Sequence, residues 1–384
     1  MAPGHCTPIP EDYVPRRVLH VEMGRHLYGG AQQVVHLLGG LGERGIENVL
    51  VCAEGSDIGR MLSPTASRVH ELSLRGELDW SLASRLARIV RREQPDLVHL
   101  HSRRGADTFG GLAGWWGGRP VILSRRVDTP ESRLVAALKY RLFDRVIAIS
   151  QCIERVLRAA GVPQAKLRCV PSGIDTTPFS QPAERAWLCR EFGLNESALL
   201  VGLVAQLIPR KGHVVLLDAV ERLQPTYPQL QVLLFGRGPL EASLGAEISR
   251  RSLRHCVRLV GFRSDLPRIV PALDLVVHPA LAEGLGVALI QAAAAGVAII
   301  GSRAGGIPEI VRDGENGLLV EPGSAGELAA AMNRLLGDPP LRRRLGQAGR
   351  SLVARHFTYG RMVAGNLEVY RELLDSQCQL RAAS

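Results

Sequence analysis

Lysine and aromatic residues are scarce in this chain of 384 residues. Aromatic side chains make up 4% of the sequence, and only Lys139, Lys166 and Lys211 are lysines among the 47 basic residues. The net charge of +10 therefore comes from arginine, and acidic residues are spread along the chain among the basic ones. This even distribution argues against a nucleic-acid-binding tail but leaves room for a local patch that attracts phosphate or acidic lipid.

Paired cysteines and long apolar runs are missing as well. The seven cysteines are scattered and contain no CxxC pair, so neither a disulfide framework nor a zinc site is expected. No apolar run approaches the about 20 residues that span a bilayer. The first residues, "MAPGHCTPIPEDYVPRR", lack the apolar core of a signal peptide. We therefore expect a cytoplasmic protein that meets a membrane only at its surface.

Short apolar segments alternate with helical ones along the whole chain, and this is the pattern of parallel sheets covered on both faces. In the first half, strands are expected at "RVLHVEMG", "NVLVCAEG", "PDLVHLHS", "RPVILSRR" and "DRVIAIS". Helices are expected from Gly29 to about Arg44 and over 81–93.

The pattern restarts after a Pro- and Gly-rich stretch, "RCVPSGIDTTPF". Strands are expected at "ALLVGLVAQL", "LQVLLFGRG", "RHCVRLVGF", "LDLVVHPA", "GVAIIGS" and "NGLLV", and helices over 325–337, 340–355 and 359–376. The fold class is α/β, with two Rossmann-like, doubly wound domains of typical size. We place them at 1–178 and 179–356, with a C-terminal helix over 357–384 that can pack back on the first domain.

Ligands bind parallel sheets at the carboxyl ends of the strands, so the residues that follow each strand are the site candidates. Gly29 and Gly30 open a helix whose N–H groups can approach an anion, although a Gly pair alone is weak evidence. No GxGxxG is present, which argues against a nicotinamide dehydrogenase. His99 and His101 are placed on one side of their strand, and His101, at its end, is as plausible a site residue as a core one.

Charged residues follow the strands of the second half in the same way. Arg210 and Lys211 precede a helix, where two cations are unfavourable unless an anion binds. Glu283 lies in the loop before another helix, beside Gly284 and Gly286, and Gln291 follows two turns along. Taken alone, Glu283 reads more simply as an acidic residue at a helix N-terminus.

Eight segments in order resemble the large GT-B family of retaining glycosyltransferases (family 4, group 1), which use nucleotide-sugars. They are "YGGAQQ", "VHLHS", "VIAIS", "VPSGID", "PRKG", "FGRGP", "HPALAEGLGVALIQ" and "GGIPEIV…NGLLV". The resemblance implies two domains that face across a cleft, and bacterial lipopolysaccharide-core and other cell-envelope transferases are the similar enzymes. A UDP-sugar is the donor that it favours, with a glycan or lipid-linked acceptor.

Site residues are implied by the same resemblance. The catalytic set would be His101 near the donor sugar, Lys211 at the diphosphate and Glu283 at the sugar hydroxyls. The donor-binding set would be Gly29, Gly30, Gln206, Arg210, Gly236, Gly284, Leu285, Gly286 and Gln291. No cofactor and no metal are expected, because no DxD motif stands out and the cations can neutralise the diphosphate.

Two neutral amides depart from the family pattern, which has arginine at the place of Gln206 and glutamate at the place of Gln291. Because ribose recognition needs an acceptor and no proton transfer, Gln291 is expected to weaken nucleotide binding and keep the chemistry. A catalytically weakened nucleotide-sugar-binding protein is an alternative, and a nucleotide-sugar epimerase or a phosphorylase on the same plan is another.

The segment 119–145 suggests contact with an anionic membrane. It holds seven basic residues against three acidic ones, and Leu134, Leu138 and Leu142 recur at helical spacing. A core-facing helix with a solvated basic flank explains those leucines more simply. A bilayer-embedded acceptor favours the other interpretation, peripheral attachment to the inner face of the cytoplasmic membrane.

Overall fold

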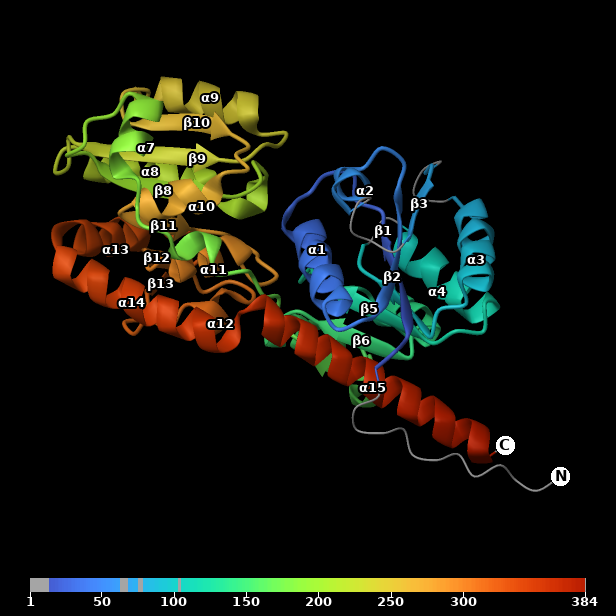
Figure 1. Cartoon of the computed structure of the whole chain (residues 1–384). Helices are drawn as coiled ribbons and strands as arrows, with labels where there is room; N and C mark the ends of the chain where they lie inside the picture. The colour runs from blue at the N-terminus through green and yellow to red at the C-terminus, as the bar shows by residue number, and fades with distance from the viewer. Residues whose placement is uncertain (1–13, 63–67, 75–78, 103–104, 384) are drawn as a thin grey trace. The chain divides into compact units, whose positions relative to one another are not determined.

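The computed structural model describes residues 14–62, 68–74, 79–102 and 105–383, and for 380–383 the backbone only. It forms two compact α/β units (Figure 1). Unit 1 combines Met1–Gly173 with Tyr359–Ser384, and unit 2 is Ile174–Thr358. Residues 1–13, on which the expectation about a signal peptide rests, lie outside the described residues.

Backbone hydrogen bonds show why the chain changes units where it does. The N–H of Gly173 donates to the side chain of Gln33 in unit 1, at 3.0 Å. The next N–H, of Ile174, donates to the carbonyl of Phe357 in unit 2, at 2.9 Å. The chain passes from unit 1 to unit 2 after Gly173 and returns after Thr358, and these two places lie side by side. The first lies shortly before the expected boundary at 178, and the second shortly after the expected boundary at 356.

Unit 1 is built on a seven-stranded, fully parallel sheet with the strand order β3-β2-β1-β4-β5-β6-β7. Its strands are β1 (Arg17–Glu22), β2 (Glu47–Ala53), β3 (Arg68–Leu72), β4 (Leu97–Leu100), β5 (Val121–Arg125), β6 (Arg145–Ala148) and β7 (Leu167–Cys169). The central strands are buried on both faces, as their unbroken apolar sequences predict. In the register of β1 with β4, His20 lies beside His99.

Helices cover both faces of this sheet. They are α1 (Gly29–Gly42), α2 (Asp57–Leu62), α3 (Ser81–Glu93), α4 (Ala106–Trp116), α5 (Arg133–Lys139), α6 (Gln151–Ala159) and the C-terminal α15 (Tyr359–Ala383), with 3-10 turns η1 (Tyr140–Leu142) and η2 (Gln164–Lys166). Helix α15 packs against α1, and Tyr370 and Leu373 of α15 share a core with Leu37 and Leu41 of α1.

Unit 2 repeats the plan with six parallel strands in the order β10-β9-β8-β11-β12-β13. Its strands are β8 (Leu199–Val204), β9 (Leu230–Phe235), β10 (Val257–Gly261), β11 (Leu275–His278), β12 (Ala298–Ser302) and β13 (Leu318–Val320). Its helices are α7 (Arg185–Phe192), α8 (His213–Leu223), α9 (Glu241–Arg250), α10 (Leu266–Ile269), α11 (Val287–Ala294), α12 (Ile307–Ile310), α13 (Ala325–Gly337) and α14 (Pro339–His356), with turns η3 (Pro178–Ser180), η4 (Pro209–Lys211) and η5 (Val270–Ala272).

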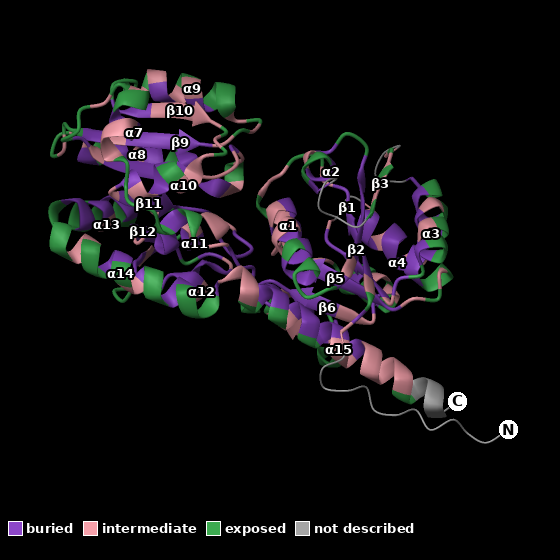
Figure 2. Ribbon diagram, in the orientation of Figure 1, coloured by how far each residue is buried: buried purple, intermediate pink, exposed green. Residues whose placement is uncertain are grey.

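Both sheets reverse their strand order once, between β1 and β4 in unit 1 and between β8 and β11 in unit 2. The predicted α/β class with two doubly wound parallel sheets is thus confirmed. The central strands are buried, the edge strands β3 and β10 are partly exposed, and the outer faces of helices such as α9 and α14 are exposed (Figure 2). A ligand crevice is expected beside each reversal, outside the carboxyl ends of the strands. Among the described residues, every helix is too short or too polar to cross a bilayer.

Candidate functional site

Glycine holds the loops of unit 2 in backbone contact at the carboxyl edge of its sheet. Gly212, after Lys211, has φ +71°, and a Cβ added there would lie 1.8 Å from the carbonyl oxygen of Pro279. Glycine is therefore required where the loop after β8 crosses the loop after β11. The N–H of Leu281 donates to the carbonyl of Arg210 at 2.8 Å and joins the same two loops.

Glu283 is fixed from the other side by the loop after β12. Gly305 has φ +54°, and a Cβ there would lie 1.7 Å from the carbonyl oxygen of Glu283. The N–H of Gly306 donates to that same oxygen at 3.0 Å. The backbone of Glu283 is thus held between two strand-end loops, which sets the direction of its carboxylate.

A buried polar cluster of Lys211, Glu283 and His278 lies at this edge. The Lys211 ammonium forms an ion pair with Oε2 of Glu283, and His278 Nε2 lies 2.7 Å from the same oxygen. The N–H of Gly284 donates to Oε1 at 3.0 Å. All three side chains of the cluster are buried. The predicted catalytic residues Lys211 and Glu283 are therefore in direct contact.

Charge neutralisation decides the protonation of this cluster. Burial alone would raise the pKa of Glu283, but the hydrogen bond from His278 and the charge of Lys211 hold that pKa well below its usual range. Glu283 is therefore a carboxylate at neutral pH. A buried ion pair of this kind is sensitive to the loss of either partner, because the remaining charge stays uncompensated.

Sequence reasoning missed two buried histidines here, His278 within the cluster and His213 beside it. His278 ends β11 and contacts Glu283, and His213 begins α8. Burial, together with the neighbouring His278 and Lys211, lowers the pKa of His213 to about 4. Within the described part of the chain, both ring nitrogens of His213 and Nδ1 of His278 make no hydrogen bond. The sequence signal that could have identified them is their position, because His278 ends an expected strand and His213 begins an expected helix.

The remaining donor-binding candidates lie on the same loops. Gln206 follows β8, and a Cβ added at Gly236 would lie 3.6 Å from its backbone nitrogen. Leu285 is buried and Gly286 caps α11, on which Gln291 is half-buried. In the described structure the side chains of Gln206 and Gln291 are not hydrogen-bonded to other side chains or backbone, so both amides are available to a ligand.

Unit 1 brings together a second group of polar residues, at its own strand reversal. Gly29 and Gly30 open α1 without a side-chain cap, and a Cβ at Gly30 would lie 3.6 Å from Cδ of Arg126. Arg126 Nη2 lies 3.4 Å from Nδ1 of His101. The predicted residues Gly30 and His101 are therefore linked through Arg126, which sequence reasoning had assigned only to a basic surface.

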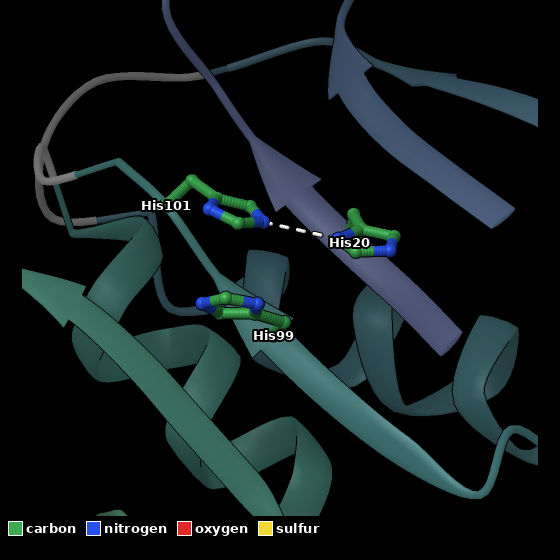
Figure 3. Close-up of side chains that lie close together, drawn as sticks. All are labelled: His20, His99 and His101. Atoms are coloured by element: carbon green, nitrogen blue, oxygen red, sulfur yellow. Dashed lines mark hydrogen bonds between the residues drawn. The ribbon is translucent and has the colours of Figure 1, made fainter. Parts of the chain in front are cut away.

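His101 belongs to a buried cluster with His20 and His99 (Figure 3). Its ring centroid lies 3.9 Å from that of His99, as expected from their placement on one side of the strand. His101 Nε2 lies 3.0 Å from His20 Nδ1. His99 Nδ1 lies 2.7 Å from the hydroxyl of Tyr370, so the C-terminal helix α15 contributes a hydrogen-bond partner to the cluster.

Burial keeps the three rings neutral. It lowers the pKa of His20 to about 3 against the opposing effect of the hydrogen bond that His20 donates to Asn48, and it lowers the pKa of His99 and His101 well below the ordinary value. It also lowers the pKa of Arg126 to about 10, so the guanidinium remains a cation at neutral pH. His101 is therefore an uncharged imidazole beside the positive charge of Arg126.

Helix α5 contradicts the simpler interpretation of 119–145, in which its leucines face the core. Leu134 is 85% exposed and Leu138 72% exposed, so these leucines do not face the core. Arg125 is buried and lies 3.3 Å from Glu131, and Lys139 lies 2.9 Å from the same carboxylate. The exposed cations here are Arg133 and Arg141. The exposed surface of α5 is therefore apolar, with two exposed arginines beside it.

Comparison with known proteins places this architecture in a family. Residues 188–352 match the model of the glycosyl transferases group 1, and residues 28–178 match that of the Glycosyltransferase Family 4. The two matches follow the two units in order. The chain belongs to this family of glycosyltransferases.

Similar proteins include transferases named for the lipopolysaccharide core and for phosphatidylinositol mannosides. A lipopolysaccharide core biosynthesis glycosyltransferase, LpsE of Rhizobium meliloti, is 27% identical over 89% of this chain and 95% of its own length. A GDP-mannose-dependent phosphatidylinositol monomannoside mannosyltransferase of Mycolicibacterium smegmatis is 27% identical over 70% of this chain and 75% of its own. Anabaena HepE, solved with UDP-glucose, shares the GT-B fold at a TM-score of 0.83 and 21% identity, over 94% of this chain and 99% of that one.

Proposed function

We propose that this glycosyltransferase moves a sugar from a UDP-sugar, with retention of anomeric configuration, to a lipopolysaccharide-core or other envelope glycan or lipid acceptor. The observation that carries the proposal is the buried cluster of Lys211, Glu283 and His278 at the strand reversal of unit 2. The relationship to LpsE supports the acceptor class, and the complex of HepE with UDP-glucose supports the nucleotide.

Breaking a sugar–phosphate bond leaves negative charge on the departing diphosphate and positive charge at the anomeric carbon. In our proposal Lys211 faces the diphosphate, and Leu285 and Gly286, just before α11, offer their backbone N–H groups to it. Glu283 binds sugar hydroxyls, and Gln291 accepts a hydrogen bond from the ribose. His101 contacts the donor sugar from unit 1. The leaving phosphate takes the proton of the acceptor hydroxyl, which attacks from the same face.

The Lys211–Glu283 pair gives this arrangement a resting state. Without a donor, each charge is neutralised by the other inside the protein. A bound diphosphate adds a second anion beside Lys211 and draws the ammonium toward it, which leaves Glu283 an acceptor for hydroxyl groups. Pairing with Glu283 thereby keeps the Lys211 ammonium inside the protein without an uncompensated buried charge before the donor binds.

The test is a panel of UDP-, GDP- and ADP-sugars incubated with the purified full chain, with nucleotide release as the readout. We expect release from a UDP-sugar, with a rate unchanged by EDTA because the protein's cations neutralise the diphosphate. Binding without release would support the alternative of a weakened nucleotide-sugar-binding protein, which the neutral amides of Gln206 and Gln291 favour. Release only from a GDP-sugar would replace the donor and keep the reaction.

We also propose that α5 attaches the protein to an anionic membrane surface. Leu134, Val135 and Leu138 are all more than half exposed, and Arg133 and Arg141 flank them. Apolar side chains that enter the lipid headgroup region beside cations are typical of peripheral helices. Each arginine near anionic lipid contributes about 1 kcal/mol.

Liposome co-sedimentation tests this attachment. We expect pelleting with anionic vesicles that is lost at high salt and in a Leu134→Ser/Leu138→Ser double variant. Val214→Ser, which removes an exposed apolar side chain from unit 2, is the matched control and should pellet like the wild type. Equal pelleting with neutral and anionic vesicles would refute the proposal.

A further inference from the structure

A buried chain of hydrogen bonds runs through unit 1 from Asn48 to Arg126. His20, fully buried in the middle of β1, lies 3.1 Å from Asn48 Oδ1 through Nε2 and 3.0 Å from His101 Nε2 through Nδ1. His101 Nδ1 faces Arg126 Nη2 at 3.4 Å. Each imidazole in this chain therefore has one partner at each nitrogen, and the end groups decide which nitrogen carries the proton. The dashed line in Figure 3 marks the contact between His20 and His101.

The Asn48 end is fixed by the backbone. Asn48 Nδ2 donates to the carbonyls of Leu38, at 3.0 Å, and Ile46, at 3.1 Å. A flipped amide would point its oxygen at both carbonyls, so Oδ1 is the atom that faces His20. Because Oδ1 only accepts, His20 Nε2 carries the proton.

The remaining tautomers follow from neutrality. A neutral His20 with its proton on Nε2 offers a lone pair at Nδ1, so the proton between the two rings belongs to His101 Nε2. His101 Nδ1 is then an acceptor. The guanidinium of Arg126, which only donates, lies on that side. The assignments made from the two ends of the chain agree.

We propose that Asn48 and His20 are positioning residues that hold His101 in the Nε2–H tautomer. In this tautomer Nδ1 of His101 is an acceptor, which faces Arg126 Nη2 at 3.4 Å in the resting protein and which a hydroxyl of the donor sugar takes over from Arg126 when the donor binds. The second statement rests on the proposed function, while the first concerns the resting protein alone. His101 thus acts as a hydrogen-bond acceptor for one hydroxyl of the donor sugar. A deoxy-sugar donor that lacks this hydroxyl would lose the contact.

A metal ion is the competing interpretation of the same residues. One nitrogen from each of His20, His99 and His101 lies within 4.8 Å of the others. All six ring nitrogens, however, already have protein partners, among them Ser124 at 2.8 Å from His99 Nε2. The cation of Arg126 beside His101 opposes a second positive charge. The hydrogen-bond chain explains the cluster without displacing any of these contacts.

Long-range ¹H–¹⁵N spectra of the full chain with ¹⁵N-labelled histidine test the tautomers directly, since the unprotonated nitrogen resonates well downfield of the protonated one. Spectra of His20→Leu and His101→Gln assign the signals. We expect both His20 and His101 to show the Nε2–H pattern, unchanged by stoichiometric Zn²⁺. An Nδ1–H pattern for His101, or ring shifts of His20 and His101 on adding Zn²⁺, would overturn the proposal. This arm needs no substrate and stands apart from the proposed function.

Kinetics with the preferred nucleotide-sugar test the positioning role. His20→Leu removes the acceptor for His101, and kcat/KM should fall about ten- to hundredfold, the usual effect of losing the outer partner of a functional histidine. His20→Asn places an oxygen where Nδ1 was, and should restore both the His101 signals and most of the rate. His255→Asn, at an exposed histidine of unit 2, is the control. His20→Leu with wild-type kcat/KM and His101 shifts would refute the role.

Discussion

At the scale of single residues, the contact between Lys211 and Glu283 changes what mutagenesis should show. The sequence alone predicts that alanine at either position lowers turnover by orders of magnitude and leaves thermal stability nearly unchanged. In the structure each residue neutralises the other inside the protein. Removing one leaves a buried charge without its partner, which costs about 3–5 kcal/mol. Stability and activity are therefore coupled at this site.

A double variant separates the two effects. Lys211→Met and Glu283→Gln alone should each lower the melting temperature and reduce turnover by orders of magnitude. Lys211→Met/Glu283→Gln removes both charges, so its stability should return toward that of the wild type while turnover stays low. Differential scanning calorimetry together with nucleotide release measures both. Single variants that melt like the wild type would show that the ion pair does not form in solution.

A substitution at Gln291 is expected to strengthen binding of the nucleotide. If its amide accepts a hydrogen bond from the ribose, Gln291→Glu supplies a charged acceptor and should tighten nucleotide binding by about 1 kcal/mol. Calorimetric titration with UDP measures the change, and Gln347→Glu on α14 serves as a surface control. Weaker binding in the Gln291→Glu variant would mean that Gln291 has a different partner.

A site residue could be predicted only where the local sequence around it indicates its role. Lys211 and Glu283 each follow a strand, and their segments were enough to single them out. His20 and Asn48 lie within apolar strands, and their contact with His101 depends on β1 lying between β2 and β4. A single segment carries no information about strand order, so these residues could not be found from the sequence.

At the scale of elements, glycines govern how closely the strand-end loops of unit 2 approach. Gly212→Ala would combine a left-handed backbone, which costs about 1–2 kcal/mol for a side chain, with a collision against Pro279. Gly314 has a similar φ of +74° with no heavy atom of another segment within 4 Å of an added Cβ. Gly314→Ala is therefore the matched control for backbone strain alone.

Urea unfolding and donor binding should distinguish the two glycine variants. We expect Gly212→Ala to lose more stability than Gly314→Ala and to lose nucleotide-sugar binding, because Lys211 moves with the displaced loop. Gly314→Ala should bind the donor normally. Equal losses of stability in the two variants would mean that contact with Pro279 does not constrain this loop.

Elements with strong patterns were predicted well, and weakly patterned ones were not. The helices 81–93 and 325–337 have the expected bounds, because their apolar positions recur on one face. Strand β3 was missed since it is a short edge strand, "RVHEL", with partly exposed polar positions. The leucines of α5 share the spacing of a core-facing helix, and only the packing shows that they are exposed.

At the scale of the whole molecule, buried neutral histidines make stability depend on pH. His213, with a pKa lowered to about 4, binds fewer protons when folded than when unfolded below its ordinary value near 6.5. The stability is therefore full above pH 6.5 and falls as the pH is lowered toward 4. His20, whose pKa is lowered to about 3, acts in the same direction in unit 1.

The contribution of His213 can be isolated by substitution. His213→Leu cannot take up a proton, so between pH 6 and 4 its unfolding free energy should fall less steeply, by up to about 1.4 kcal/mol per pH unit. Urea titrations at several pH values give the slope. His255→Leu, at an exposed histidine of unit 2, should retain the wild-type slope. An identical slope for His213→Leu would show that His213 is not buried as a neutral ring.

The central proposal is that this glycosyltransferase transfers a sugar from a UDP-sugar with retention. Real-time proton NMR of the purified chain with an α-linked UDP-sugar tests it most directly, because the anomeric proton reports the configuration of the first product. We predict release of UDP together with an α-configured product, and a loss of both signals in Lys211→Met/Glu283→Gln. A β-configured first product, or wild-type turnover by the double variant, would contradict the account.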